Sequence, residues 1–175
     1  RYAAKLEPEH YPDWSEEEFR RILPELAAPY FPEMRSFSDL GRADFFTALR
    51  AELGAERLRE LDRDYPESFT SPAGASHKID YSGAVPTLPV RVQEMYGVKV
   101  HPVLGRSRQP LRVELLSPAG RPVQVTTDLP GFWRGNWPLV RKEMKGRYPK
   151  HFWPENPAEA LPTTRTRMKM EQSGG

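Results

Sequence analysis

Basic and aromatic side chains gather in residues 121–150, where their types fit the binding of a phosphate backbone. Lysine and arginine neutralise phosphates, and aromatic rings stack on bases without regard to base identity. The candidate nucleic-acid-binding residues are Arg121, Trp133, Arg134, Arg141, Lys142, Lys145, Arg147 and Lys150. Tyr148 offers a second ring for stacking. The stretch therefore predicts a surface that binds single-stranded nucleic acid in a sequence-tolerant manner.

A structural explanation of the same stretch stands beside this one. Four residues recur at helical spacing: Trp137, Val140, Met144 and Tyr148. This spacing predicts an apolar helix face that packs against a core, so we expect Trp137 and Tyr148 to be buried. The intervening cations fit a solvated helix face as well as they fit a binding surface.

The segment GRYPKHFWP, residues 146–154, also admits two explanations. Its cations can bind phosphate. Alternatively its prolines set the path of the chain, while Phe152 and Trp153 anchor it by burial. In the second case we expect a docking segment against a larger protein body.

Upstream of the basic residues, alternating apolar and polar side chains predict an antiparallel hairpin. Its strands are Leu111–Ser117 and Arg121–Thr126, and its turn is Pro118–Gly120. The inward-facing residues of this register are Val113, Leu115, Val123 and Val125. A slip by one residue would turn all of them to solvent, so the register should be firmly set.

Two helices are expected after the hairpin. Asp128 is a capping residue for the first. The second begins near Asn136 or Trp137, because Pro138 is favourable in a first helical turn, and Gly146 is well placed to end it. These helices would carry most of the candidate cations.

Residues 67–127 change from helical to strand-like periodicity. About five short strands are expected in this part, counting the two of the hairpin. The others are indicated by turn residues at 71–74 with a partner strand at His77–Tyr81, and by alternating valines at Val98, Val100 and Val103. Val90–Tyr96 fits either a helix or a strand. Five short strands with regular turns predict a small antiparallel β-barrel-like sheet, similar to an oligonucleotide-binding (OB) fold.

The N-terminal part is helical in pattern. Ser15 and Glu18 form a capping box for a helix over Ser15–Ala27. A second helical stretch covers Phe45–Leu61, is preceded by possible start residues at Ser38 or Asp39, and is interrupted at Gly54.

We therefore predict an α+β fold in three parts. Residues 1–66 form a helical segment, residues 67–127 form the small antiparallel, OB-like domain, and residues 128–175 form a C-terminal helix with a Trp/Pro-rich tail.

Composition narrows the class of protein. The chain has 175 residues and 19 prolines, which favours short elements joined by stiff turns. It has no cysteine, so disulfides and thiolate ligands are excluded, and a cytoplasmic location is expected. No apolar run is long enough to span a membrane, so no membrane insertion is expected.

Charge is distributed unevenly along the chain. Residues 1–96 carry 12 Lys and Arg against 18 Asp and Glu, whereas residues 97–175 carry 14 against 6. The basic second half favours phosphate or an acidic protein surface as a partner.

No catalytic site is predicted. The sequence contains neither a Gly-rich phosphate loop followed by Lys-Ser/Thr nor a DEAH box, so we expect no ATP hydrolysis by this chain alone. The four histidines are scattered, so no metal site and no cofactor are expected. The carboxylates of Asp80, Glu94 and Asp128 could pair for acid–base chemistry only if the fold brought them together.

Three sequence segments carry a family resemblance: KIDYSGAVPTLPVRVQEMYGV, LLSPAGRPVQVTTDLPGFW and VRKEMKGRYPKHFWPENPAEALPTTRTR. They resemble the C-terminal region of the HrpB family, bacterial ATP-dependent helicases of the DEAH/RHA group. The resemblance is close over residues 79–167 and loose before Ser71.

The resemblance implies an accessory C-terminal region of an ATP-dependent RNA helicase, a hydrolase whose core domains bind ATP and Mg²⁺ elsewhere in the same polypeptide. Helicases of this group carry an OB barrel late in the chain, in agreement with the expected sheet. The region would bind single-stranded RNA or DNA beside the motor, or fix the geometry of the motor. The alternative is a protein-interaction or scaffolding module without nucleic-acid contact, in which the basic face and the tail recruit a protein partner.

Overall fold

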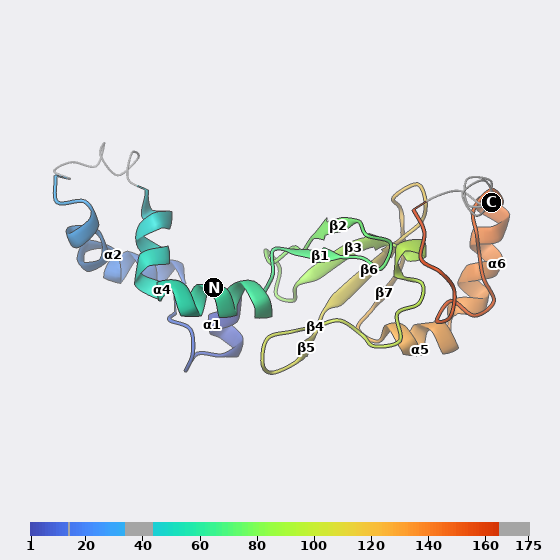
Figure 1. The fold of residues 1–175 in the computed structure, drawn as a ribbon, viewed down its shortest axis with the longest axis horizontal. Coiled ribbons are helices and arrows are strands. Elements are labelled where there is room, and N and C mark those ends of the chain that lie inside the picture. Colours follow the sequence, from blue (N-terminus) through green and yellow to red (C-terminus); the bar gives the residue numbers. More distant parts are fainter. Residues whose placement is uncertain (14, 34–43, 165–175) are drawn as a thin grey trace. The chain divides into compact units, whose positions relative to one another are not determined.

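The computed structural model describes residues 1–13, 15–33 and 44–164 (Figure 1). The chain divides into two compact units. Unit 1 comprises Arg1–Pro66 together with Gly105–Ser107, and unit 2 comprises Glu67–Leu104 together with Arg108–Gly175. The expected helix start at Ser38 or Asp39 lies outside the described residues.

Unit 1 is built from helices. Their bounds are α1 Tyr2–Leu6, α2 Glu16–Tyr30 and α4 Phe45–Asp64. The predicted capping residue of α2 is confirmed, because the Ser15 hydroxyl oxygen accepts a hydrogen bond from the backbone N–H of Glu18 at 3.3 Å. The helix continues through Pro24 and ends at Tyr30, because a proline removes only one backbone hydrogen bond and leaves the others in place.

Helix α4 begins one residue after Asp44, whose carboxylate accepts from the backbone N–H of Thr47 at 3.0 Å. Gly54 adopts φ 76° and ψ 159°, so the helix is kinked at the residue where the sequence predicts an interruption. Only glycine adopts these angles without strain. After the kink the helix runs three residues beyond the predicted end at Leu61.

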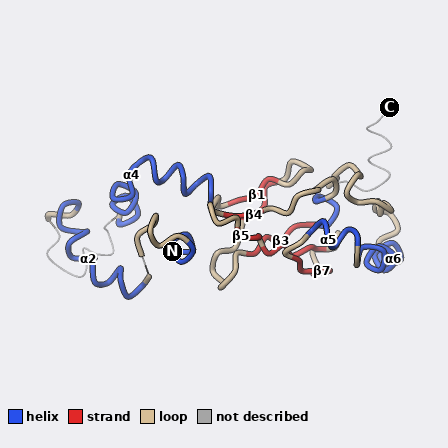
Figure 2. Tube along the Cα trace, turned by 90° about the horizontal axis from the view of Figure 1, so that it is seen from below, coloured by secondary structure: helices blue, strands red, loops and turns tan. Residues whose placement is uncertain are grey.

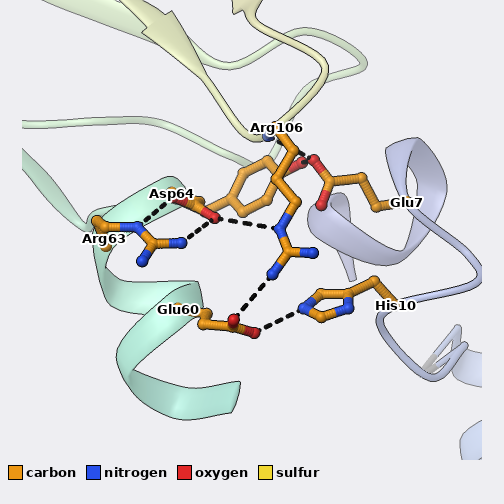
Figure 3. A network of polar contacts seen from close by, with 7 residues as sticks. Glu7, His10, Glu60, Arg63, Asp64 and Arg106 are labelled. Carbon is orange, nitrogen blue, oxygen red and sulfur yellow. Dashed lines mark hydrogen bonds and ion pairs between the residues drawn. The ribbon is translucent and has the colours of Figure 1, made fainter. Parts of the chain in front are cut away.

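A polar network holds the loop Gly105–Ser107 within unit 1 (Figure 3). The Arg106 guanidinium donates to Glu60 at 2.8 Å and lies 3.9 Å from Asp64, while its backbone N–H donates to Glu7 at 2.8 Å. His10 bonds the other oxygen of Glu60 at 2.7 Å. Arg106 therefore neutralises carboxylates of its own unit.

The short strands of unit 2 form separate sheets (Figure 2). β1 (Ser68–Thr70) pairs with β2 (Ser76–Lys78), and β4 (Val103–Leu104) pairs with β5 (Gln109–Pro110). The main sheet has the order β3-β6-β7 and comprises β3 (Thr87–Arg91), β6 (Arg112–Leu116) and β7 (Pro122–Thr126). A 3₁₀ turn, η1 (Val92–Met95), follows β3.

The α+β class is confirmed, and the sheet is more open than the barrel-like prediction. Among the described residues no sheet closes on itself. β3 and β6 also pair in parallel, with Leu88 opposite Val113, whereas the prediction was antiparallel throughout. Sequence patterns show the strands but not their partners, and a parallel pair needs a crossover that no local turn specifies. Val90–Tyr96 contains the end of the strand and then the 3₁₀ turn.

The hairpin of β6 and β7 is confirmed, with Gly120 at φ 75° closing the predicted turn. Its two strands are buried to different degrees. Val113 and Leu115 are fully buried, but Val125 is 41% exposed, so the predicted inward face of the return strand is wrong. A shift in the register between Leu115 and Leu116 accounts for the difference, because an irregularity there rotates the side chains of the facing strand.

Two helices follow β7, as predicted. α5 spans Leu129–Arg134 and begins after Asp128, whose carboxylate accepts from the N–H of Gly131 at 2.9 Å. α6 spans Trp137–Arg147, with Pro138 in its first turn. The chain after α6 runs as a loop beside that helix (Figures 1 and 2).

Candidate nucleic-acid interface

The two C-terminal helices are held by a cluster of aromatic rings. Trp137 is fully buried, and its ring centroid lies 5.7 Å from that of Tyr96 and 5.5 Å from that of Trp133. Met144 is buried on the same face of α6, two turns further on. The predicted apolar face is therefore confirmed at Trp137 and Met144, whereas Val140 and Tyr148 are only half-buried. The two buried residues fix which side of the helix faces solvent.

The tail after α6 is fastened to unit 2 by hydrogen bonds to its backbone carbonyls. The Trp137 indole N–H donates to the carbonyl of Pro154 at 3.0 Å, and the N–H of Gly97 donates to Pro157 at 2.9 Å. The Trp153 indole donates to Tyr148 at 2.9 Å, and its ring is buried. Trp153 and Pro154 of GRYPKHFWP thus make these contacts within unit 2 itself.

Arg141 belongs to this fastening. Its Nε–H donates to the carbonyl of Trp153 at 3.0 Å, and its guanidinium bonds Glu155 at 3.1 Å. The side chain is 28% exposed. Of the predicted cations, Arg141 is therefore the one that clamps the tail.

The other cations of α5, α6 and the following loop face solvent. Arg134, Lys142, Lys145 and Lys150 are exposed, and none has an ion-pair partner among the described residues. We call these four residues the basic surface. Lys142 and Lys145 are three residues apart, so they lie on the same side of α6. That they contact nucleic acid stays a prediction.

The remaining candidates are placed differently. Arg147 is exposed but lies 3.2 Å from Glu143, one helical turn earlier. Arg121 is exposed at the hairpin turn. Trp133 is 5% exposed and donates its indole N–H to the carbonyl of Val98 at 3.1 Å, so its ring is a core element with little face left for a base. Tyr148 is half-buried and bonds the Ser117 hydroxyl.

A pocket of about 220 Å³ beside α5 adds residues that the sequence analysis missed. We call it the α5 pocket. Its lining residues are Val98, Lys99, Pro130, Trp133, Arg134, Asn156 and Ala158. Lys99 and Asn156 were missed because they lie far from Arg134 in sequence and no local pattern connects them. The closeness of Lys99 to Trp133 is visible only in the fold.

The carboxylates considered for acid–base chemistry are not brought together. Glu94 is 2% exposed, and its Oε2 contacts His77 Nε2 at 2.6 Å and the Ser71 hydroxyl at 3.2 Å. Asp80 instead accepts from the backbone of Ser82, and Asp128 caps α5. Glu94 therefore fastens the β1–β2 hairpin to η1.

His101 links the sheet to the start of α5. Its Nε2 lies 2.7 Å from the carbonyl of Leu111, and its Nδ1 lies 3.1 Å from the N–H of Leu129. The neutral ring with the proton on Nε2 satisfies both bonds, donating to the carbonyl and accepting from the N–H. Burial lowers the pKa of His101, against the smaller opposing effects of the Leu111 carbonyl and the Asp128 carboxylate.

The described residues contain no group of three or more His, Asp or Glu that could hold a metal ion. Nor does the described part of the chain include a helix with the length and hydrophobicity that crossing a bilayer requires.

Comparison with known proteins defines the class. Residues 26–157 match the model of the HrpB_C family, described as the C-terminal region of ATP-dependent helicases. The chain belongs to this family.

A relative from Escherichia coli (strain K12), the ATP-dependent RNA helicase HrpB, is 42% identical over 94% of this chain and 21% of its own length. The crystal structure of the E. coli DExH-box NTPase HrpB is similar with a TM-score of 0.83 and 42% identity, covering 94% of this chain and 20% of that one. A second crystal structure, of the E. coli DEAH/RHA helicase HrpB, gives a TM-score of 0.67 and 39% identity over 86% of this chain and 19% of that one. The chain thus spans about a fifth of the length of the relatives it matches.

Proposed function

We propose that this chain is the accessory C-terminal region of an ATP-dependent RNA helicase and that its basic surface binds single-stranded nucleic acid beside the motor. The family match and the relative's name support the first part. The observation that carries the second part is the set of exposed cations without carboxylate partners among the described residues, on and beside helices pinned by a buried aromatic cluster.

The physical argument rests on which charges are available. Residues 129–150 contain six Lys and Arg and a single acidic residue, Glu143. Glu143 lies close to Arg147, and Arg141 reaches Glu155. Within the described ranges, Lys142, Lys145, Arg134 and Lys150 therefore remain for an external anion. A strand of phosphates supplies such anions at regular spacing, and its binding releases condensed counterions.

ATP and Mg²⁺ are assigned to the helicase core domains of the same polypeptide, outside these 175 residues. The residues present do not fit a nucleoside triphosphate, because no phosphate loop of backbone amides followed by Lys-Ser/Thr occurs in the sequence. We place this chain in the cytoplasm, in accord with the lack of cysteine in its 175 residues and with a nucleic-acid partner.

The test is a titration of the chain with fluorescently labelled oligouridylate, oligothymidylate and heparin at several salt concentrations. We expect binding of both oligonucleotides that weakens steeply with salt, with a log–log slope of about −0.7 for each phosphate neutralised. Absence of binding at low salt, or binding that salt leaves unchanged, would contradict the proposal.

A scaffolding role within the helicase is the second candidate. It is favoured by two exposed apolar side chains in unit 2, Leu139 on α6 at 73% and Leu161 in the tail at 76%. Such residues lose unfavourable contact with water when a protein surface covers them. If neither oligonucleotide binds, capture of the separately produced helicase core by the chain, weakened by Leu139→Asp, would support this role.

A further inference from the structure

The α5 pocket is formed by three segments that are distant in sequence. Val98 and Lys99 follow η1, Trp133 and Arg134 belong to α5, and Asn156 comes from the tail. All of them lie in unit 2. The pocket therefore depends on the fold rather than on any single element.

Hydrogen bonds to backbone carbonyls hold the walls together. The Trp133 indole N–H donates to the carbonyl of Val98 at 3.1 Å, which joins α5 to the segment after η1. The N–H of Gly97 donates to the carbonyl of Pro157 at 2.9 Å, which joins that segment to the tail. Gly97 has φ 81°, and a Cβ there would lie 3.3 Å from the carbonyl of Ala160, so the close approach favours glycine. A ligand would enter a pocket whose walls are already positioned.

The lining chemistry favours an anion. Lys99 and Arg134 are exposed cations, Asn156 adds an amide donor, and no carboxylate lines the pocket among the described residues. A larger hollow of about 630 Å³ in the same unit is lined by Glu67 and Asp80 as well as Lys78. Those carboxylates would repel a phosphate, so the two hollows differ in the charge that they accept.

The volume of the α5 pocket and its apolar lining restrict the kind of ligand further. A volume of about 220 Å³ lies below the range of about 300–1,000 Å³ that drug-sized ligands occupy. It suits a fragment such as a single phosphate with part of its sugar. Val98, Pro130 and Ala158 supply an apolar part of the lining on which a ribose can rest.

We propose that the α5 pocket is a phosphate subsite that takes one phosphodiester of a single-stranded nucleic acid through Lys99, Arg134 and Asn156. This inference rests on the proposed function and adds two residues to it. Because Arg134 belongs both to the pocket and to the basic surface, a bound strand continues from one to the other.

The experiment follows the Trp133 indole signal of the ¹⁵N-labelled chain by NMR, assigned with Trp133→Phe. The probes are a uridine dinucleotide, which has one phosphodiester, and uridine, which has none. We expect the dinucleotide to shift the Trp133 signal and uridine to leave it in place. Lys99→Gln should weaken dinucleotide binding about tenfold, because one charge-assisted hydrogen bond is lost.

Matched controls separate the pocket from the basic surface. Lys78→Gln removes the same charge from the exposed strand β2 and should leave dinucleotide binding unchanged. The double variant Lys142→Glu/Lys145→Glu should weaken binding of a long oligonucleotide while the dinucleotide still shifts the Trp133 signal. Asn156→Ala is a second pocket variant, and it should weaken dinucleotide binding without a change of charge.

The outcomes distinguish the two proposals. Binding of a long oligonucleotide with an unmoved Trp133 signal and no effect of Lys99→Gln would overturn the subsite and leave the proposed function standing. No binding of any oligonucleotide at low salt would overturn both. A phosphoserine peptide that shifts the Trp133 signal as strongly as the dinucleotide would overturn the assignment to nucleic acid.

Discussion

Units 1 and 2 use their positive charges in different ways. In unit 1 several arginines meet carboxylates of the same unit: Arg63 contacts Asp64 at 2.7 Å, and Arg106 contacts Glu60 at 2.8 Å. Residues 1–66 carry 10 Lys and Arg against 15 Asp and Glu, so carboxylates outnumber cations in this part of the sequence. On α6 of unit 2, Lys142 and Lys145 have no such partner among the described residues.

The contrast shows that a count of cations does not locate a binding surface. A cation already paired with a carboxylate must lose that partner before it can neutralise a phosphate. An unpaired cation has no such partner to lose, and its binding releases counterions condensed on the nucleic acid. Arg141 is a paired cation within unit 2, because it donates its hydrogen bonds to Trp153 and Glu155 of the tail.

The largest expected effect is on the free energy of unfolding, when a buried side chain of α6 is truncated. Trp137→Ala should lower the free energy of unfolding by about 3–5 kcal/mol, because it leaves a cavity and removes the hydrogen bond to Pro154. Urea denaturation measures this loss. A change as small as that of a surface substitution would show that the aromatic cluster does not hold the helix.

A smaller loss of folding stability is expected when Arg141 is truncated. Arg141→Ala should cost about 1–2 kcal/mol, since the hydrogen bond to the Trp153 carbonyl is partly screened by solvent. Lys142→Ala, one residue later and exposed, is the matched control and should leave the unfolding midpoint almost unchanged. Equal effects of the two substitutions would contradict the distinction between a clamping and a free cation.

Local patterns predicted much of this fold. The Ser15 and Asp128 caps, the turn at Gly120 and the burial of Trp137 and Met144 on α6 depend on residues within a few positions of one another, and all are confirmed. Hydrogen-bonding and steric rules act at that range, so a single sequence reveals them.

Long-range pairings could not be predicted. The parallel pairing of β3 with β6 and the hydrogen bond from Gly97 to Pro157 join residues that no local pattern relates. The division of the candidate cations into clamping and free ones has the same origin. Whether Arg141 is free to bind a phosphate depends on where the Trp153 carbonyl lies in the fold. No pattern in the sequence predicts that position.

In unit 1 we expect a modest, salt-dependent effect at Arg106. Arg106→Ala should lower the thermal midpoint by less than Arg141→Ala does, because its side chain is half exposed and its ion pairs are screened. Differential scanning fluorimetry at low and high salt measures it. The difference from wild type should shrink as salt is added, and a difference that grows would argue against an electrostatic role.

The smallest effect is on the pH dependence of stability. Burial lowers the pKa of His101 below its ordinary value of 6.5, and His151 is shifted in the same direction by burial and by Arg91. The unfolded chain therefore binds protons at a higher pH than the folded chain does. Stability is fully present above pH 6.5 and falls as the pH drops from there toward the lowered folded values.

Urea denaturation between about pH 5 and 7.5 tests this pH dependence of stability. The window spans roughly one pH unit on either side of the pKa of an unperturbed histidine. His101→Gln should flatten the pH dependence, and adding His151→Gln should flatten it further. A pH dependence that neither change reduces would show that other groups carry it.

The most direct test of the account compares charge reversal in the two units. Lys142→Glu/Lys145→Glu reverses two free cations of α6, and Arg57→Glu/Arg59→Glu reverses two exposed cations of α4 in the acidic unit. Oligouridylate affinity is measured for both variants and the wild type over a range of salt. If the basic surface binds phosphates, the α6 variant loses affinity and its log–log salt slope flattens by about 1.4. The α4 variant keeps the wild-type slope. Equal slopes for all three proteins would contradict the central claim.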